Sequence, residues 1–296
     1  MTTTLLPVGE AQGRPTKRDR ILGLPKSGKL IIGLSIVGFF AVVAIVGPMV
    51  AGDPEAMVGG RVEPPSAAAW LGTTDTGQSV LDQLLYATRD SMLIGFSVGL
   101  LGTAVSLAFG VTSGYVGGWL DEALSLLSNV ALVIPAIPLL ILIADYVDGG
   151  GPLMIALIIA AISWAGPARV IRSQTMSLRN REYVDAARVS GEPGWRIMIV
   201  QILPNLVPLI ASGLVWGVIG GVLTESGLSA LGVGGGYATT WGSMLYFAQN
   251  GYALSLGAWW WFVPPGMCIA VLGTGLSLIN FSIDELMNPR LRKAAS

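Results

Sequence analysis

Three features of this 296-residue sequence could carry chemistry: a run with glycines and lysines, an isolated glutamate and a tryptophan triplet. The run Gly23–Leu30 (GLPKSGKL) has the glycine and lysine spacing of a phosphate-binding loop. Such a loop needs Ser or Thr after its lysine to hold magnesium, and Leu30 stands there instead. We therefore interpret the run as a basic flank of a membrane span, and we expect no ATP site in this chain.

Glu225 is the one acidic residue isolated between long apolar runs. An ionisable group at membrane depth predicts a functional site, because its desolvation is costly. Alternatively, Glu225 lies at the external interface, where it caps a span or binds Ser226, and we favour this second interpretation. The triplet Trp259–Trp261 could stack on a sugar or a cation, but an aromatic belt at a membrane interface is the more common use of Trp. Glu225, Ser226 and Trp259 are our candidate residues of a substrate pathway.

Residue types on which many enzymes depend are scarce. The sequence has no histidine and one cysteine, Cys268. This composition excludes a histidine triad, a histidine-ligated metal and an internal disulfide. The apolar stretches also contain no carboxylate pair for acid–base work. We predict no catalytic residue, no metal site and no enzymatic activity of this chain.

The elements that must position these residues are membrane helices. The sequence is 52% hydrophobic and 12% charged, and a bilayer-crossing helix needs about 20 apolar residues. Uncharged stretches of that length are 30–52, 91–120, 123–144, 149–168 and 197–224, and a longer uncharged run, 226–283, follows Glu225. We interpret 226–256 as a non-spanning segment and 259–281 as a sixth helix. The sequence therefore predicts an all-α membrane protein with six transmembrane helices.

The basic residues predict the orientation. Six Lys and Arg precede the first span, six lie between spans four and five, and three follow the sixth, so 15 of the 17 fall on one side. That side is the cytoplasm by the positive-inside rule, which gives cytoplasmic N- and C-termini in the cell membrane. The net charge of −1 argues against a nucleic-acid partner. We divide the chain into a basic cytoplasmic tail (1–29), a first transmembrane helix (30–52), an external segment (53–90), a five-helix core (91–283) and a cytoplasmic tail (284–296).

The cytoplasmic segment 169–204 contains a helix–break–helix pattern. Residues 182–190 favour a short helix, Gly191 can end it, and Pro193 can start a second helix. Ala186 and Ala187 are expected to form a face of small side chains that another protein surface could approach closely. The pattern suits docking to a soluble partner, and an ordinary positively charged loop is equally compatible with it.

The segment resembles the EAA loop of ABC-transporter permeases, in the branch that imports oligopeptides, dipeptides or nickel. The matching residues are Glu182, Tyr183, Val184, Ala186, Ala187, Arg188, Gly191, Arg196, Ile197 and the run Ile202-Leu203-Pro204-Asn205. Asp185 replaces the name-giving glutamate, and Gln201 replaces the histidine usual in this branch. Further matches run from residue 71 to Arg290. Departures at 78–79 and 280–285 leave a substrate other than a peptide open.

The resemblance implies a type I ABC importer core with a division of labour. A second homologous permease subunit would share the translocation pathway, two cytosolic ABC ATPase subunits would bind ATP and Mg, and an extracellular solute-binding protein would deliver the solute. This chain would hold no cofactor. The residues implied in coupling to the ATPases are Glu182, Tyr183, Asp185, Ala186, Ala187, Arg188, Gly191, Arg196 and Pro204.

The cargo implied first is an oligopeptide or dipeptide, with an oligosaccharide or a metal chelate as alternatives. A different class, an ion-coupled secondary transporter that acts alone, would need paired intramembrane charges or inverted repeats. The predicted spans contain almost no ionisable groups. We therefore expect an importer subunit rather than a secondary transporter.

Overall fold

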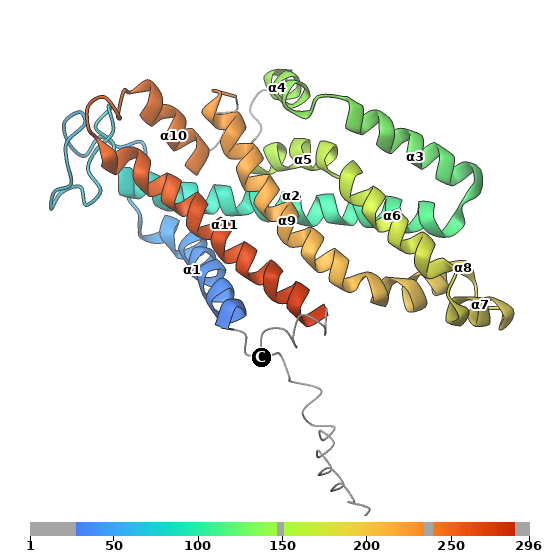
Figure 1. The fold of residues 1–296 in the computed structure, drawn as a ribbon. Helices are drawn as coiled ribbons and strands as arrows, with labels where there is room; N and C mark the ends of the chain where they lie inside the picture. The colour runs from blue at the N-terminus through green and yellow to red at the C-terminus, as the bar shows by residue number, and fades with distance from the viewer. Residues whose placement is uncertain (1–27, 147–150, 234–238, 288–296) are drawn as a thin grey trace, which may run out of the picture.

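The computed structural model describes residues 28–146, 151–233 and 239–287, and the regular elements of these ranges are helices (Figure 1). They are α1 (Gly28–Val50), α2 (Val80–Val116), α3 (Gly118–Val133), α4 (Ala136–Tyr146), α5 (Pro152–Ser163), α6 (Ala165–Arg179), α7 (Glu182–Val189), α8 (Gly194–Arg196), a π-helical turn η2 (Ile197–Ile202), α9 (Leu203–Ala230), α10 (Trp241–Asn250) and α11 (Trp259–Met287). Most of the run Gly23–Leu30 and of both predicted tails lies outside the described residues.

Four stretches are each long and apolar enough to cross a membrane: α1, α2, Gly194–Ala230 and Trp259–Glu285. Two bent pairs pass the same test together, α3 with α4 at 84° and α5 with α6 at 48°. The described residues therefore hold four to six candidate spans, which confirms an all-helical, multi-pass membrane protein. Six spans and the orientation of the termini stay predictions.

Proline residues account for both bends. Ile134 ends α3 in an extended conformation (φ −69°, ψ 125°), which the residue before Pro135 prefers for steric reasons. Pro167 has no N–H to donate to the carbonyl of Ser163, so the hydrogen-bond ladder is interrupted between α5 and α6. At this bend the buried hydroxyl of Ser106 in α2 donates to the carbonyl oxygen of Trp164 over 2.8 Å. The bend thus has a polar partner from the neighbouring helix.

The long helix α2 is the centre of the bundle, with α9, α11, α5 and α6 along it (Figure 1). Its 37 residues extend about 55 Å at 1.5 Å per residue, well beyond the hydrocarbon thickness of about 30 Å. Glycines allow the closest approaches, as in many membrane bundles. A Cβ added to Gly99 would lie 2.6 Å from Val218 Cγ2 of α9, and one added to Gly110 would lie 2.7 Å from the carbonyl oxygen of Ala168 in α6.

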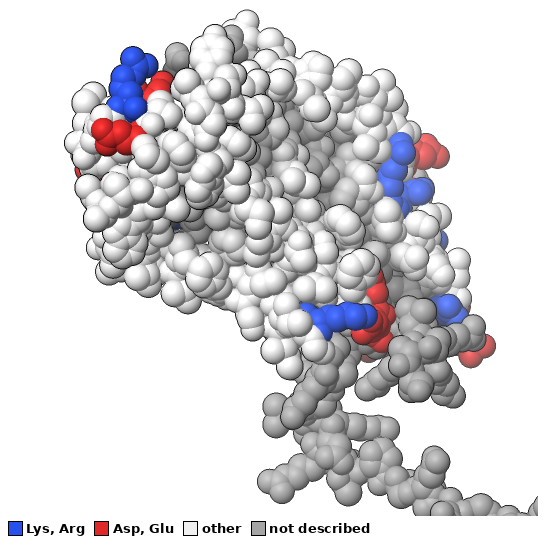
Figure 2. All heavy atoms as spheres, turned by 60° about the vertical axis from the view of Figure 1, so that its left-hand side comes forward, with Lys and Arg blue, Asp and Glu red and all other residues white. Residues whose placement is uncertain are grey.

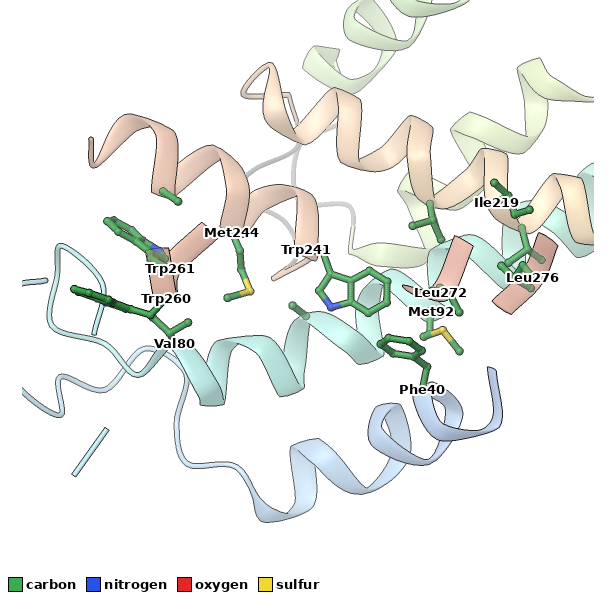
Figure 3. Close-up of a cluster of buried hydrophobic side chains, with 14 of the residues drawn as sticks. Phe40, Val80, Met92, Ile219, Trp241, Met244, Trp260, Trp261, Leu272 and Leu276 are labelled. Carbon is green, nitrogen blue, oxygen red and sulfur yellow. The ribbon is translucent and has the colours of Figure 1, made fainter. Parts of the chain in front are cut away.

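The largest apolar cluster of the described residues lies where α1, α2, α9, α10 and α11 meet (Figure 3). Trp241 of α10 is fully buried at its centre, and its ring meets that of Phe40 of α1 edge to face at 5.5 Å. The indole Nε1 of Trp241 donates to Thr88 Oγ1 (3.2 Å), and its backbone N–H donates to Ser91 Oγ (3.0 Å). Burying a large ring with both polar groups satisfied fixes α10 against α2.

The helix bounds refine the expected boundaries at two places. α2 begins at Val80, with Ser79 as its N-cap, so helix covers the last part of the segment that we expected to lie outside the membrane. The region 226–256 holds the end of α9 and all of α10.

Figure 2 shows a wide uncharged band on the visible face, with Lys, Arg, Asp and Glu gathered toward its ends. Such a band is what a lipid-facing surface requires.

Candidate functional site

The helix–break–helix segment projects at the end of the bundle opposite α10 and the loop before α2 (Figure 1). α7 ends in a Schellman motif, in which the N–H of Glu192 donates to the carbonyl of Ala187 (3.1 Å) and the N–H of Gly191 to that of Arg188 (3.0 Å). Gly191 has φ +79°, a left-handed conformation that glycine adopts at least cost. Pro193 is the N-cap of α8. The expected helix, break and second helix are all present.

The inner face of α7 is anchored in the chain's own core. Val184 is fully buried and Ala187 is 8% exposed, and both belong to an apolar cluster with Ile171 of α6 and Ile197 and Ile202 of η2. The expectation that Ala186 and Ala187 form one docking face is therefore wrong. They are consecutive residues on a helix, so they point about 100° apart, and only Ala186 is exposed.

The outer face of α7 carries Glu182, Asp185, Ala186 and Val189, at the i, i+3, i+4, i+7 spacing of one helical stripe. All four are exposed, and Val189 is 90% exposed. Asp185 accepts a hydrogen bond from Arg188 over 2.8 Å. The outer face of α7 therefore presents apolar side chains between charged ones to the solvent.

Trp195 of α8 is a second exposed apolar residue of this segment, 62% exposed. Neither Val189 nor Trp195 was among the predicted coupling residues. The sequence does hold the signal, a valine and a tryptophan within a segment rich in Arg and Glu. It could not show that these two side chains, unlike Val184 and Ile197, point away from the core.

The remaining predicted coupling residues lie around this outer face and its base. Arg188 also places its guanidinium 5.6 Å from the ring centroid of Tyr115 in α2. Tyr183 accepts a hydrogen bond from Asn205 Nδ2 over 3.4 Å, and Arg196 lies 3.8 Å from Glu192.

Pro204 is the second residue of α9, two positions after the end of η2. A proline ring displaces the carbonyl four residues earlier, here that of Val200 within the π-helical turn. The wider turn therefore accommodates the ring within one continuous helical stretch, Gly194–Ala230. The chain thus passes from the exposed segment into α9 without a loop.

A groove of about 540 Å³ lies near the centre of the bundle and is bordered by α2, α5, α6, α9 and α11. Its lining is mostly apolar or glycine, with hydroxyls from Thr103, Ser106, Ser163, Ser212 and Thr224. Trp216 of α9 is 59% exposed there, and Asp284 of α11 is the one charged residue of the lining. A path for a solute needs such a surface, because it offers weak polar contacts and no strong trap.

The three predicted pathway residues lie elsewhere. None of Glu225, Ser226 and Trp259 lines the groove. Trp259 is 53% exposed at the start of α11, whereas Trp260 and Trp261 are buried in the cluster around Trp241. The prediction that all three tryptophans form an interfacial belt is therefore wrong for Trp260 and Trp261.

Glu225 is enclosed by the chain, with 1% of its surface exposed. Its Oε1 accepts hydrogen bonds from Ser229 Oγ (2.8 Å) and Thr240 Oγ1 (2.5 Å), and its Oε2 accepts from Ser226 Oγ (3.4 Å). The contact with Ser226 is the one we expected, but the side chain does not face an open interface. Within the described ranges no group of three or more Cys, Asp or Glu residues could hold a metal ion.

Comparison with known proteins identifies the family of the chain. The sequence model of the family described as the inner membrane component of binding-protein-dependent transport systems matches residues 106–293. The chain belongs to this family. The matched range contains α7, η2, Glu225 and most of the groove.

Curated relatives of the chain are permeases. The oligopeptide transport system permease protein of Mycobacterium tuberculosis is 35% identical over 174 residues, which are 58% of this chain and 60% of the relative. The dipeptide transport system permease protein of Alkalihalophilus pseudofirmus is 30% identical, over 93% of this chain and 90% of the relative. That of Haemophilus influenzae is 34% identical, over 69% of this chain and 72% of the relative. The chain spans about 60% of the length of the mycobacterial relatives that it matches.

Proposed function

We propose that the chain is the permease subunit of an ABC importer for oligopeptides or dipeptides. The family match carries this proposal, because it covers both the exposed helix α7 and most of the groove. The names of the relatives favour a peptide cargo over an oligosaccharide or a metal chelate. The ion-coupled alternative gains no support from the groove, whose lining contains a single charged residue.

The outer face of α7 is the proposed contact with a cytosolic ATPase. Ala186 permits close approach, and Val189 and Trp195 supply apolar surface that is costly to leave in water. Of the ion pairs at the rim, Asp185–Arg188 is solvent-exposed and Arg196–Glu192 is partly exposed with a separation of 3.8 Å, so each contributes little. Affinity should therefore depend on packing at the apolar residues more than on charge.

The groove is the proposed wall of the translocation pathway. Trp216 of its lining is 59% exposed, so this chain alone leaves the groove open to the outside. A second, homologous permease subunit would complete the wall. In this arrangement ATP and Mg bind to the two ATPase subunits, an extracellular solute-binding protein delivers the peptide, and both termini of this chain lie in the cytoplasm. The hydroxyls of Thr103, Ser163 and Thr224 then offer exchangeable hydrogen bonds to a peptide backbone.

The docking proposal is tested by Ala186→Arg in the full complex, co-expressed with the partner permease and the ATPase subunits. The arginine would fill the space needed for close approach, so we expect ATPase recovery with the tagged chain to fall at least tenfold. Gln174→Arg is the matched control, because it places the same charge on an exposed position of α6. Val189→Asp should act like Ala186→Arg by making the apolar contact polar.

Membrane insertion and co-purification of the partner permease must stay normal in all three variants. Recovery of the ATPases with both Ala186→Arg and Val189→Asp would refute the assignment of α7. The transport proposal is tested separately, by ATP-dependent uptake of a labelled dipeptide into proteoliposomes with the binding protein present. Uptake of an oligosaccharide but not of a peptide, or ATP hydrolysis by this chain alone, would contradict it.

A further inference from the structure

A second cavity, of about 300 Å³, lies between α2, α3 and α6, apart from the groove and from the outer face of α7. Its lining contains two guanidinium groups, those of Arg169 and Arg172, and no Asp or Glu side chain. The rest of the wall combines small residues, such as Ser125 and Ser128, with the larger side chains of Phe109, Leu124 and Asn129. The volume is in the range of pockets that bind small ligands.

Arg172 is held in place by an acidic partner outside the lining. Its Nε and Nη2 donate to Asp121 Oδ1 and Oδ2 over 2.5 and 2.6 Å. Asp121 also accepts hydrogen bonds from Ser113 and Ser125, two residues of the lining, so its oxygens are already occupied. A guanidinium has five N–H donors. The other three donors of Arg172 have no partner among the described residues.

Arg169 adds a positive charge, and no acidic group of the described residues lies within hydrogen-bonding distance of it. Its Nη2 donates to Asn129 of α3, a neutral group, and the side chain is exposed. The cavity therefore combines two guanidinium groups and one carboxylate, a net charge of about +1. Planar guanidinium forks match the oxygens of a phosphate group, with which they form short, charge-assisted hydrogen bonds.

The surroundings of the cavity indicate where such a phosphate comes from. Trp119, at the start of α3, is 78% exposed, as is typical of a tryptophan at a membrane interface. Leu126 and Val130 of α3 are 63% and 51% exposed, next in sequence to the lining residues Ser125 and Asn129. Acyl chains can therefore lie along α3 while a headgroup enters the cavity. We propose that this cavity binds the phosphate group of an acidic phospholipid.

The proposal does not depend on the transport function. It places the lipid in the cytoplasmic leaflet, and this placement rests on the proposed orientation of the chain. Basic pockets between helices on that side are suited to anionic headgroups. A lipid headgroup and free phosphate in the cytosol both offer the cavity a negatively charged phosphate group. The apolar face of α3 favours the lipid.

The test uses the purified full chain in a zwitterionic detergent. Thermal protection is measured during titration with phosphatidylglycerol, with phosphatidylcholine and with inorganic phosphate. We expect protection by phosphatidylglycerol alone. Arg169→Gln should raise the half-saturating concentration about fivefold, because one basic side chain near an anionic surface contributes about 1 kcal/mol. Arg181→Gln, which removes the same charge from an exposed position outside the cavity, should leave it unchanged.

Arg169 is chosen because its removal leaves the Arg172–Asp121 pair intact, and size-exclusion chromatography of the variant verifies its fold. Equal weakening by Arg169→Gln and Arg181→Gln would overturn the proposal, since binding would then follow total charge. Equal protection by phosphatidylcholine would overturn it as well. Protection by inorganic phosphate but not by phosphatidylglycerol would assign the cavity to a soluble anion and refute the lipid.

Discussion

The hydrogen bonds around Glu225 predict a local opening of α10 when one hydroxyl is removed. Thr240 Oγ1 donates to Glu225 Oε1 over 2.5 Å and accepts from the N–H of Ser243 over 3.1 Å, in a capping box. It thus joins the first turn of α10 to the interior of α9. Thr240→Val keeps the shape of the side chain and removes both hydrogen bonds.

The expected cost follows from the two interactions. Loss of a buried hydrogen bond to a carboxyl group costs about 2 kcal/mol, and loss of a threonine N-cap costs about 1 kcal/mol. A total of about 3 kcal/mol corresponds to a factor of about 100 in an opening equilibrium. Hydrogen exchange of the amides of α10, followed by mass spectrometry on a peptide that covers 241–250, should therefore accelerate by about two orders of magnitude, because exchange reports local opening.

Thr274→Val is the matched control. The Thr274 hydroxyl donates only to the carbonyl of Ala270 in its own helix, over 2.8 Å, and the residue is exposed on α11. That variant should leave exchange in α10 unchanged. If both variants gave the same exchange rates in α10, the network around Glu225 would not fix that helix. An equal acceleration in all helices of Thr240→Val would also refute the reasoning, since it would indicate global destabilisation.

Two further pairs of variants test the packing. Gly217→Leu should destabilise the chain by about 1–3 kcal/mol through overpacking, because a Cβ there would lie 2.9 Å from Gly99 Cα. Gly220→Leu should keep the thermal stability, because a Cβ there meets no atom within 4 Å. It should lower peptide uptake, because Gly220 faces the groove. Ala187→Arg should lower the thermal stability by the equivalent of about 3 kcal/mol, because it places a charge in the cluster around Val184. Ala186→Arg should change the stability of the original chain by no more than about 0.5 kcal/mol. Thermal unfolding in detergent measures the stability of both alanine variants.

Much of the fold follows from the sequence because charge is costly in a bilayer. The uncharged stretch 30–52 became α1, and the start of α11 at Trp259 and the end of α7 before Gly191 were both expected. The start of α2 was missed, because charged residues at 82, 89 and 90 interrupt the apolar pattern there. A helix that continues past the hydrocarbon region carries no hydropathy signal, and only its N-cap, Ser79, marks where it begins.

The site was harder to predict than the spans, for a reason of geometry. Hydropathy gives the depth of a residue but not the face of the helix on which it lies. Ala186 and Ala187 are identical in sequence terms, yet only Ala187 packs in the core. Likewise, Glu225 stood out as an isolated charge, but its partners Ser229 and Thr240 emerge only when α9 and α10 are brought together.

Ile171 connects the two parts of the proposed machinery. It is 4% exposed in α6, belongs to the cluster that anchors Val184 and Ala187 of α7, and also lines the groove. Protein interiors are close-packed and barely compressible, so a displacement of α7 cannot be absorbed in the cluster and must move its neighbours. α6 is bent from α5 beside the groove. Under the proposed function, movement of the ATPases would therefore reach the groove wall through the packed inner face of α7, while its outer face remains free to bind.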